Sequence, residues 1–559
     1  DDPRFLQNIS RATIAGMYAG PYHFARLDIA TNTGTDEADH FIQAAGPWMR
    51  PGYLVPVFDL EAGQGVRNND GLAQFCIDFS NRIFEVMRIR PGMYINGNYS
   101  NLLQGSSPSL RDALAKPGAY TPSVVSPAFS MLWDARYGAG NISQTSPEFS
   151  LDLIPVQTGS PKNNGTVNNT YYGPWDDYGN SEPWAFWQYA SVVSVPGFNA
   201  VDSTIDSNVA HGDIEFVRNF LVPAVWWHDN NGNWGDLANW NSGQPASAPV
   251  IPGAQPTPYP VDNGVNPIPV PRLPGAAGSG PTSGQYDTVI LERPNADITV
   301  TLSSGTYNIR KLYMRETLNI TGGSLTVNYD PTYRPDDSPY VKHGGPISAQ
   351  FSGPVTSSGN AMFKAHTIQV DAGKTVTLNG GLLRFNKMLL QLSNVSPAKI
   401  VVGSNVQFAS DSAANAFPVI TNGSGTGLTG SIDLTGGNRT FTVHNGTELT
   451  LGVPVNNGAL VKSGPGILRL PRDNPYAGGT TINGGRVIVS NTGGSATGSG
   501  PVTVNSGGIF GGTGRIAGTV TVNGGATLTA GTTNSIGTLT LESTPVLNGT
   551  TALKISRVG

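Results

Sequence analysis

The sequence predicts two kinds of fold in one chain, an α/β domain followed by a long all-β solenoid. Helix and strand patterns alternate up to about residue 223, whereas short strands separated by Asn-Gly and Gly-Gly turns recur from about residue 285. Only 13% of residues are charged, and 71 glycines and 42 prolines interrupt the chain. This composition excludes a coiled coil or a helical bundle.

Residues 1–223 carry the α/β pattern. The nearly continuous apolar run YLVPVFDLE at 53–61 is typical of a parallel strand buried on both faces. Apolar residues at three- and four-residue steps between Leu72 and Met87 predict a helix, with Asp70 as its expected N-cap. Such alternation favours a parallel sheet or a barrel. The other expected elements are strands at 17–25, 93–96, 131–135 and 185–190 and helices at 36–45 and 212–221.

Residues 224–284 separate the two parts and form the second of three expected domains. Eleven prolines fall between Pro245 and Pro281, and such a stretch is extended and cannot enter the interior of a sheet. We therefore expect a linker or a large loop here.

A motif of a glycine turn followed by a strand recurs through residues 285–559. The last copies begin at Asn483, Asn505 and Asn523, at intervals that indicate a solenoid, most simply a right-handed parallel β-helix. The alternative is an up-and-down β-sandwich with similar turns. The copies are TGGSLTV (321–327), LNGGLLRF (378–385), NGTELTL (445–451), NGGRVIV (483–489), NGGATLT (523–529) and the weaker NSGGIF (505–510).

Two carboxylates end the apolar strand of the first domain. Asp59 and Glu61 are two residues apart, so strand geometry places both side chains on one face, roughly 6.6 Å apart along the strand. That distance is close to the separation two carboxylates need around a glycosidic bond. Mutual repulsion and the apolar strand would raise one pKa and create a proton donor. The alternative is a pair of solvated acids at a strand exit.

Other polar and aromatic residues lie at expected strand ends and could converge on the same site. His23 lies at the end of the first expected strand, and we interpret it as a hydrogen-bonded structural residue rather than a catalyst. The candidates for binding are Tyr22, Tyr94, Trp133, Tyr137, Gln188 and Asp206.

Together these segments resemble glycoside hydrolase family 25, the lysozymes of the N,O-diacetylmuramidase (Chalaropsis) type. The resemblance covers residues 1–223 and implies an irregular, TIM-like β/α barrel. It implies hydrolysis of the β-1,4 bond between N-acetylmuramic acid and N-acetylglucosamine in peptidoglycan. The segments that carry it are GMYAGPYHFA (16–25), VPVFDLE (55–61), GMYIN (92–96), LWDARYG (132–138), WQYAS (187–191) and IDSNVAHGD (205–213).

The resemblance also implies roles for single residues. Glu61 matches the general acid and Asp59 the second carboxylate, which would hold the substrate's N-acetyl group as an internal nucleophile, stabilise the oxocarbenium-like transition state or activate water. Asp206, Tyr22, Tyr94, Trp133 and Gln188 match positions along the cleft, while Tyr137 lies in one of the resembling segments. No metal or other cofactor is expected.

One departure concerns the start of the barrel. The family begins with a strand that carries an active-site aspartate, and no such segment precedes Asp1. On the length of two β/α units, we expect roughly 35 to 45 residues of the barrel, including its first strand or strands, to be missing from this chain.

The second half resembles the passenger domains of autotransporters. WWHDNNGNWGDLANWNSG (226–243) resembles their opening, and residues 458–491 resemble the autotransporter-associated β-strand repeat. This implies an extracellular or surface-held bacterial protein whose solenoid is a scaffold.

The net charge is −5 and the sequence has no basic stripe, so no nucleic-acid partner is expected. No apolar run is long enough to span a membrane, so no membrane segment is expected. The expected partner is the glycan strand of peptidoglycan. Two alternatives remain open: an adhesive surface protein with a degenerate barrel, and an enzyme acting on chitin-like or other N-acetylated glycans.

Overall fold

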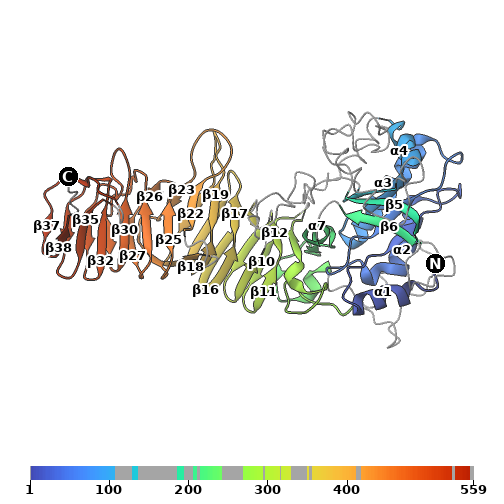
Figure 1. The fold of residues 1–559 in the computed structure, drawn as a ribbon, viewed down its shortest axis with the longest axis horizontal. Helices are drawn as coiled ribbons and strands as arrows, with labels where there is room; N and C mark the ends of the chain where they lie inside the picture. The colour runs from blue at the N-terminus through green and yellow to red at the C-terminus, as the bar shows by residue number, and fades with distance from the viewer. Residues whose placement is uncertain are drawn as a thin grey trace. The chain divides into compact units, whose positions relative to one another are not determined.

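The structure, a computed structural model, describes most of both predicted parts (Figure 1). The described residues are 2–107, 129–135, 185–193, 205–210, 214–241, 269–293, 296–314, 316–328, 349–351, 355–410, 417–531 and 535–553. Within these ranges, no helix has the length and apolarity needed to cross a membrane.

The chain divides into two compact units. The first comprises Asp1–Trp227, Leu237–Ile290 and Thr332–Pro346; the second comprises His228–Asp236, Leu291–Pro331 and Ile347–Gly559.

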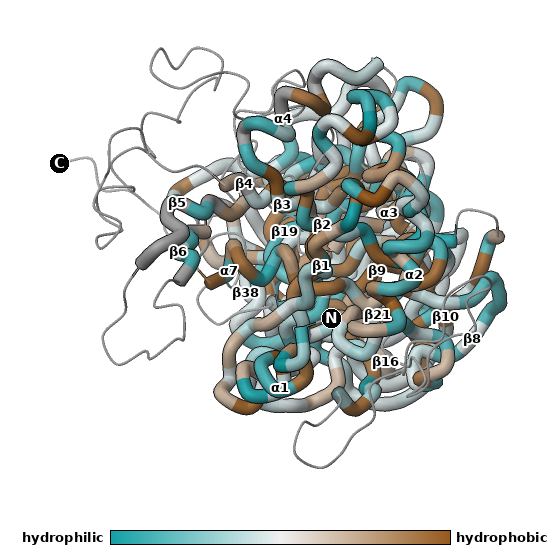
Figure 2. The backbone as a smooth tube through the Cα atoms, turned by 90° about the vertical axis from the view of Figure 1, so that its right-hand side faces the viewer, coloured by the Kyte–Doolittle hydropathy of each residue, from teal (hydrophilic) through white to brown (hydrophobic). Residues whose placement is uncertain are grey.

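A six-stranded sheet is the centre of the first unit. Its strands lie in chain order, β1 to β5 parallel and β6 antiparallel to β5, and Figure 2 shows β1 to β4 in this sequence. Among the described strands no pairing joins β6 back to β1, so a closed barrel stays a prediction. The strands are β1 (Tyr22–Phe24), β2 (Val57–Leu60), β3 (Gly92–Asn96), β4 (Leu132–Ala135), β5 (Phe186–Val193) and β6 (Ile205–Ala210). The α-helices are α1 (Phe5–Ile14), α2 (Gly34–Ala45), α3 (Asn69–Met87), α4 (Gly97–Gln104) and α7 (Ile214–Val217).

Helices α2 and α3 cover one face of this sheet. Phe58 and Leu60 of β2 are fully buried, and the Phe58 ring packs on Phe79 of α3 with centroids 4.6 Å apart. Phe79 also stacks on Phe41 of α2, at 6.2 Å. The side chains that alternate with Phe58 and Leu60 therefore point to the opposite face.

Three local details differ from the expected elements. The N-cap of α3 is Asn68, whose Oδ1 accepts a hydrogen bond from the Gly71 amide at 2.8 Å, whereas Asp70 accepts one from the Ser107 amide. The strand expected at 17–25 is shortened to β1, and the antiparallel β6 was not expected.

Residues 269–290 belong to the first unit and pack through arginines. Arg272 donates two hydrogen bonds to the buried Asp287, at 2.5 and 2.6 Å, and Arg50 donates one to the Pro269 carbonyl at 3.2 Å. The guanidinium of Arg218 lies 3.8 Å from the centre of the Tyr286 ring. This part of the expected linker or loop is thus held by specific contacts.

The second unit is built from parallel strands stacked in two large sheets (Figure 1). The chain passes repeatedly between the two sheets, and every strand pairing described within the second unit is parallel, as from β29 to β31 to β34. Parallel pairing of successive turns is typical of a solenoid and excludes an up-and-down sandwich, whose neighbours would be antiparallel.

The bounds of these strands follow. One sheet contains β8 (Gly232–Asn233), β10 (Thr299–Leu302), β11 (Thr306–Ile309), β13 (Thr317–Ile320), β14 (Ser324–Val327), β16 (Val355–Ala365), β18 (Thr375–Phe385), β20 (Lys399–Val402), β21 (Val406–Ser410), β23 (Ser431–Asp433), β24 (Asn438–Val443), β26 (Val455–Asn456), β27 (Ala459–Ser463), β29 (Thr480–Ile482), β31 (Val502–Val504), β34 (Val520–Val522) and β37 (Val546–Leu547). The other contains β12 (Lys311–Met314), β15 (Ala349–Phe351), β17 (Thr367–Val370), β19 (Lys387–Leu390), β22 (Val419–Asn422), β25 (Glu448–Leu451), β28 (Ile467–Leu470), β30 (Gly485–Val489), β32 (Gly508–Gly512), β35 (Thr527–Ala530) and β38 (Thr550–Ala552). The remaining strands are β7 (Ala224–Val225) and β9 (Thr288–Leu291), which pair with each other, and β33 (Arg515–Ile516) and β36 (Thr540–Leu541), which form a two-stranded sheet.

Stacked polar side chains hold the turns of the solenoid in register. The Asn505 side chain donates to Asn483 at 2.7 Å and accepts from Asn523 at 2.9 Å. These are the three residues at which the last copies of the repeat begin, so each turn places its asparagine above the previous one.

Lys462 of β27 is a fully buried lysine in this unit. Its Nζ donates to the carbonyls of Ser463, Gly464 and Gly484, at 2.8, 2.7 and 3.1 Å, and burial lowers its pKa to about 8. The ammonium thus takes the place of water for three turn carbonyls.

Candidate active site

The candidate site lies on the face of the sheet opposite α2 and α3. Asp59 lies in β2 between Phe58 and Leu60, which pack toward the helices, and Glu61 directly follows the strand. Because strand side chains alternate, Asp59 points to the other face, and Glu61 continues that alternation.

The parallel register brings further side chains to the same face. Phe24, Asp59, Tyr94, Trp133 and Phe186 are consecutive partners across β1 to β5. In-register neighbours in a parallel sheet share a face, so Asp59 lies in a row whose other members are aromatic. The Tyr94 and Trp133 rings meet edge to face, with centroids 5.4 Å apart.

Hydrogen bonds fix two of the aromatic side chains. The Tyr94 hydroxyl donates to Oε1 of Gln188, which is only 3% exposed, at 2.5 Å. The Trp133 indole donates to Oδ1 of Asn208 at 2.8 Å. The sequence reasoning did not select Asn208, although it lies two residues after Asp206 in β6.

Asp59 is the most perturbed acid of the site. It is 8% exposed, and its Oδ1 is buried without a hydrogen-bond partner among the described residues. Burial, and then the negative charges of Glu61 and Asp206, raise the pKa of Asp59 to about 8. The raised pKa favours the neutral form of the Asp59 carboxyl at pH 7 in the free protein. Glu61, by contrast, is exposed.

Tyr22 lies within electrostatic range of Asp59, Glu61 and Asp206, and Asp206 lies within range of Asp59. Partial burial raises the pKa of Tyr22, and the charges of Asp59, Asp206 and Glu61 raise it further. The structure thus brings together Tyr22, Asp59, Glu61 and Asp206. Of the three acids, Glu61 and Asp206 are exposed. Tyr137 lies outside the described residues.

His23 lies on the helix side of the sheet. Its ring stacks on Phe41 and Phe79 with centroids 5.1 and 5.9 Å apart, and Nε2 is 2.6 Å from Oε2 of Glu37. This confirms its interpretation as a hydrogen-bonded structural residue. In the described ranges, no three His, Cys, Asp or Glu side chains form a group that could hold a metal ion.

Comparison with known proteins identifies the segment that carries this site. Residues 1–109 match the family model described as glycosyl hydrolases family 25. This segment is therefore similar to family 25 domains. Both Asp59 and Glu61 lie within the matched residues, as do Tyr22 and Tyr94.

One curated relative is also similar to part of this chain. Lysozyme M1 of Streptomyces globisporus is 41% identical over 61 residues, which are 11% of this chain and 20% of that protein. The chain thus spans about a fifth of the length of this relative.

Two solved structures also align with the chain. The bacterial lysozyme from Streptomyces coelicolor is 20% identical, with 40% of this chain and 80% of that chain covered and a TM-score of 0.25. The muramidase from Trichobolus zukalii is 18% identical, with 40% and 81% covered and a TM-score of 0.25. At this TM-score, the alignments add nothing to the fold described above.

The solenoid has a match of its own. Residues 460–489 match the model of the passenger-associated-transport-repeat. The matched residues contain Lys462 and the first asparagine of the stacked series, Asn483.

Proposed function

We propose that this family 25-like domain hydrolyses the β-1,4 bond between N-acetylmuramic acid and N-acetylglucosamine in peptidoglycan. The observation that carries the proposal is the pair Asp59 and Glu61, a buried acid with a raised pKa beside an exposed acid, within the residues that match the family model. Two carboxyl groups in unlike environments are the arrangement that glycosidases use to divide acid and base work.

The aromatic row beside Asp59 suits a sugar ligand. Tyr94 and Trp133 present ring faces and edges on the same side of the sheet, and Gln188 and Asn208 hold them in place. Sugar rings pair apolar faces with hydroxyl edges, so a wall of aromatic rings with amide groups behind it fits them. Asp206 and Tyr22 would complete the polar edge of the cleft, and Tyr137 remains a candidate by resemblance.

Glu61 is the general acid in this proposal, and Asp59 is the second carboxylate. The raised pKa of Asp59 adds a requirement, because Asp59 must give up its proton before it can act as the charged carboxylate at neutral pH. A bound substrate that covers Glu61 would remove this carboxylate from water. Loss of hydration would favour transfer of a proton from Asp59 to Glu61. The rival assignment, favoured by the burial of Asp59, makes Asp59 the donor and Glu61 the charged partner.

A pH profile tests the raised pKa of Asp59, which both assignments share. If Asp59 is the donor, kcat/KM falls as the pH rises through about 8, because the donor loses its proton there. If Glu61 is the donor and Asp59 must be ionised, the active form still carries one proton on the pair, so kcat/KM also falls as the pH rises through about 8. The limb near pH 8 should disappear in Asp59→Asn under either assignment.

The hydrolysis itself is tested by the reducing ends of the products. Purified peptidoglycan and chitin oligosaccharides are each incubated with the protein, and the new reducing sugar is identified by mass spectrometry after borohydride reduction. Reducing-end N-acetylmuramic acid supports the proposal. Reducing-end N-acetylglucosamine from chitin oligosaccharides alone would assign the enzyme to other glycans. The same end released from peptidoglycan, or absence of cleavage, would contradict the proposal.

We further propose that the protein acts outside the bacterial cell, in the medium or at the surface. The passenger-associated repeat at 460–489 and the solenoid around it support this location. Protease treatment of intact cells that produce the protein, followed by immunodetection, tests it: loss of signal without lysis supports surface exposure. Protection in intact cells, together with absence from the medium, contradicts it.

A further inference from the structure

The segment that follows Glu61 makes a tight turn before α3. Gly63 has a left-handed backbone with φ of +99°, and its carbonyl accepts hydrogen bonds from the amides of Val66 and Arg67, both at 3.1 Å. A Cβ at Gly63 would lie only 2.7 Å from Cβ of Leu27, so this turn touches the loop that follows β1. The position of Glu61 is therefore coupled to that of its neighbour loop.

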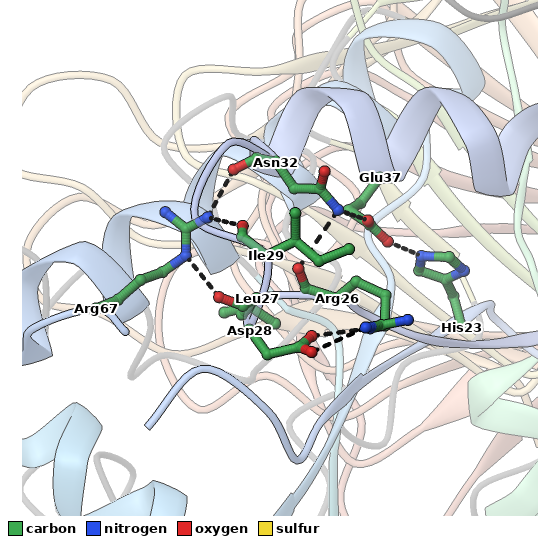
Figure 3. Close-up of polar contacts among 8 residues, drawn as sticks. All are labelled: His23, Arg26, Leu27, Asp28, Ile29, Asn32, Glu37 and Arg67. Atoms are coloured by element: carbon green, nitrogen blue, oxygen red, sulfur yellow. Dashed lines mark hydrogen bonds and ion pairs between the residues drawn. The ribbon is translucent and has the colours of Figure 1, made fainter. Parts of the chain in front are cut away.

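Arg67 joins these two loops (Figure 3). Its Nε donates to the Leu27 carbonyl at 3.0 Å, and its Nη2 donates to the carbonyls of Ile29 and Asn32, at 3.0 and 2.6 Å. Its guanidinium carbon also lies 4.9 Å from the centre of the Phe75 ring. One planar cation thus holds three carbonyls of the loop after β1 from two separate nitrogens, whereas a lysine offers a single nitrogen.

The loop that Arg67 holds is itself anchored to the sheet and to α2. The Asn32 side chain donates to Oε1 of Glu37 at 2.6 Å, and Oε2 of Glu37 is 2.6 Å from Nε2 of His23 in β1 (Figure 3). Side chains of His23 and Glu37 are 14% and 10% exposed, and the interaction with His23 helps to lower the pKa of Glu37 against the opposing effect of its burial. Contacts therefore run without a break from His23 to Arg67.

We propose that Arg67 is a positioning residue for Glu61. The guanidinium fixes the turn after β2 against a loop that His23, Glu37 and Asn32 make rigid, and this holds the Glu61 carboxyl at its place beside Asp59. The role rests on the function proposed above, because it concerns the alignment of a proton donor. Misplacement of a catalytic group by about 1 Å can lower a rate by up to ~100-fold, so a remote latch of this kind has a measurable effect.

The test compares Arg67→Ala with the matched control Arg26→Ala. Arg26 lies in the same loop and pairs only with the exposed Asp28 in the contacts described, at 2.8 and 2.9 Å, without joining the two loops. We expect Arg67→Ala to lower kcat ~10- to 100-fold with KM changed less than about threefold, and Arg26→Ala to match the wild type. Arg67→Lys should recover only part of the loss. Equal kcat in Arg67→Ala and Arg26→Ala would overturn the proposal.

Amide hydrogen exchange reads the position of the turn without reference to activity. In Arg67→Ala, the backbone amides at positions 66 and 67 should exchange at least ~10-fold faster than in the wild type. The amides of β3 should stay as protected as in the wild type. Unchanged exchange in the turn would overturn the role of Arg67 even in an inactive protein. If Arg67→Ala loses protection in β3 as well, the same exchange measurement is made on Arg67→Lys. Faster exchange confined to the turn of Arg67→Lys supports the proposal, and exchange at the wild-type rate in that turn overturns it.

The two proposals fail in different ways. If the wild type cleaves no glycan but the turn exchanges faster in Arg67→Ala, the proposed function fails and the positioning role of Arg67 stands. If the wild type cleaves peptidoglycan and Arg67→Ala keeps full activity, the proposed function stands and the positioning role of Arg67 fails.

Discussion

Asp59 of β2 lies directly beside Tyr94 of β3 in the parallel register, and the Tyr94 hydroxyl donates to Gln188 of β5 across 2.5 Å. The acid with the raised pKa and the aromatic wall are thus parts of one row on one face of the sheet. An apolar strand brings Asp59 into low-dielectric surroundings, and the same row offers rings on which a sugar could rest.

Tyr94→Phe should weaken catalysis without unfolding the domain. The change removes the donor to the buried Gln188 oxygen, and loss of such a bond costs ~1–2 kcal/mol, or about 5- to 30-fold in kcat/KM if Tyr94 is held for substrate. Tyr53→Phe is the control, since Tyr53 is buried in a separate apolar cluster with Ile9 and Trp48. Equal effects of the two changes on kcat/KM would contradict the binding role of Tyr94.

Asp59→Asn should stabilise the first unit at neutral pH. The folded-state pKa of Asp59 is about 8, well above its unfolded value, so stability is lost progressively as the pH rises from about 4 through 8. An amide does not titrate, and we expect the variant to gain ~1–3 kcal/mol in free energy of unfolding at pH 7 and much less below pH 4. Urea unfolding followed by helical circular dichroism measures this, because the helices described are in the first unit. Asp206→Asn, at an exposed site, should change little; equal gains in both variants would contradict the account.

Lys462→Met should abolish the increase in solenoid stability that the wild type shows as the pH rises above about 8. The folded-state pKa of Lys462 is lowered to about 8, so the wild type becomes more stable between pH 8 and about 10.5, by at most ~3 kcal/mol. The variant lacks this titration, and its urea midpoint, read from the β-sheet signal, should rise less over that interval. Parallel pH dependences in the two proteins would show that burial of the ammonium carries no such cost.

Asn505→Ala should destabilise the solenoid more than Asn523→Ala does. Asn505 makes two side-chain hydrogen bonds in the stacked series, to Asn483 and from Asn523, whereas Asn523 makes one of the two. Each bond contributes ~0.5–1.5 kcal/mol, so the difference in free energy of unfolding should be about the value of one bond. Identical urea midpoints for the two variants would mean that the stacked asparagines do not hold the turns.

Periodicity and turn chemistry were sufficient to predict much of the fold. The apolar run at 53–61 became β2, and the repeat that begins at Asn483, Asn505 and Asn523 became stacked turns of parallel strands. The cap of α3 could not be predicted, since Asn68 and Asp70 are equally good N-caps two residues apart and only the Ser107 amide decides between them. Closure of a barrel and the handedness of the solenoid stay predictions.

The site was predictable only as far as single strands allow. Alternation along β2 suffices to place Asp59 and Glu61 on one face, but which acid is buried depends on neighbouring strands. Asn208 and Arg67 carry no local signal: one bonds to Trp133 across the sheet, and the other reaches carbonyls that precede it by 35 to 40 residues. Contacts of this kind arise from tertiary structure alone.

The most direct test of the central claim is the rate at which Glu61→Gln releases muropeptides from purified peptidoglycan, measured beside the wild type, Asp59→Asn and the exposed control Glu85→Gln. We expect the wild type and Glu85→Gln to release products with reducing-end N-acetylmuramic acid at the same rate. The rates of Glu61→Gln and Asp59→Asn should fall ~100- to 10,000-fold, because each loses one carboxyl group of the pair. Release by Glu61→Gln at the wild-type rate would contradict the assignment of this pair as the catalytic centre.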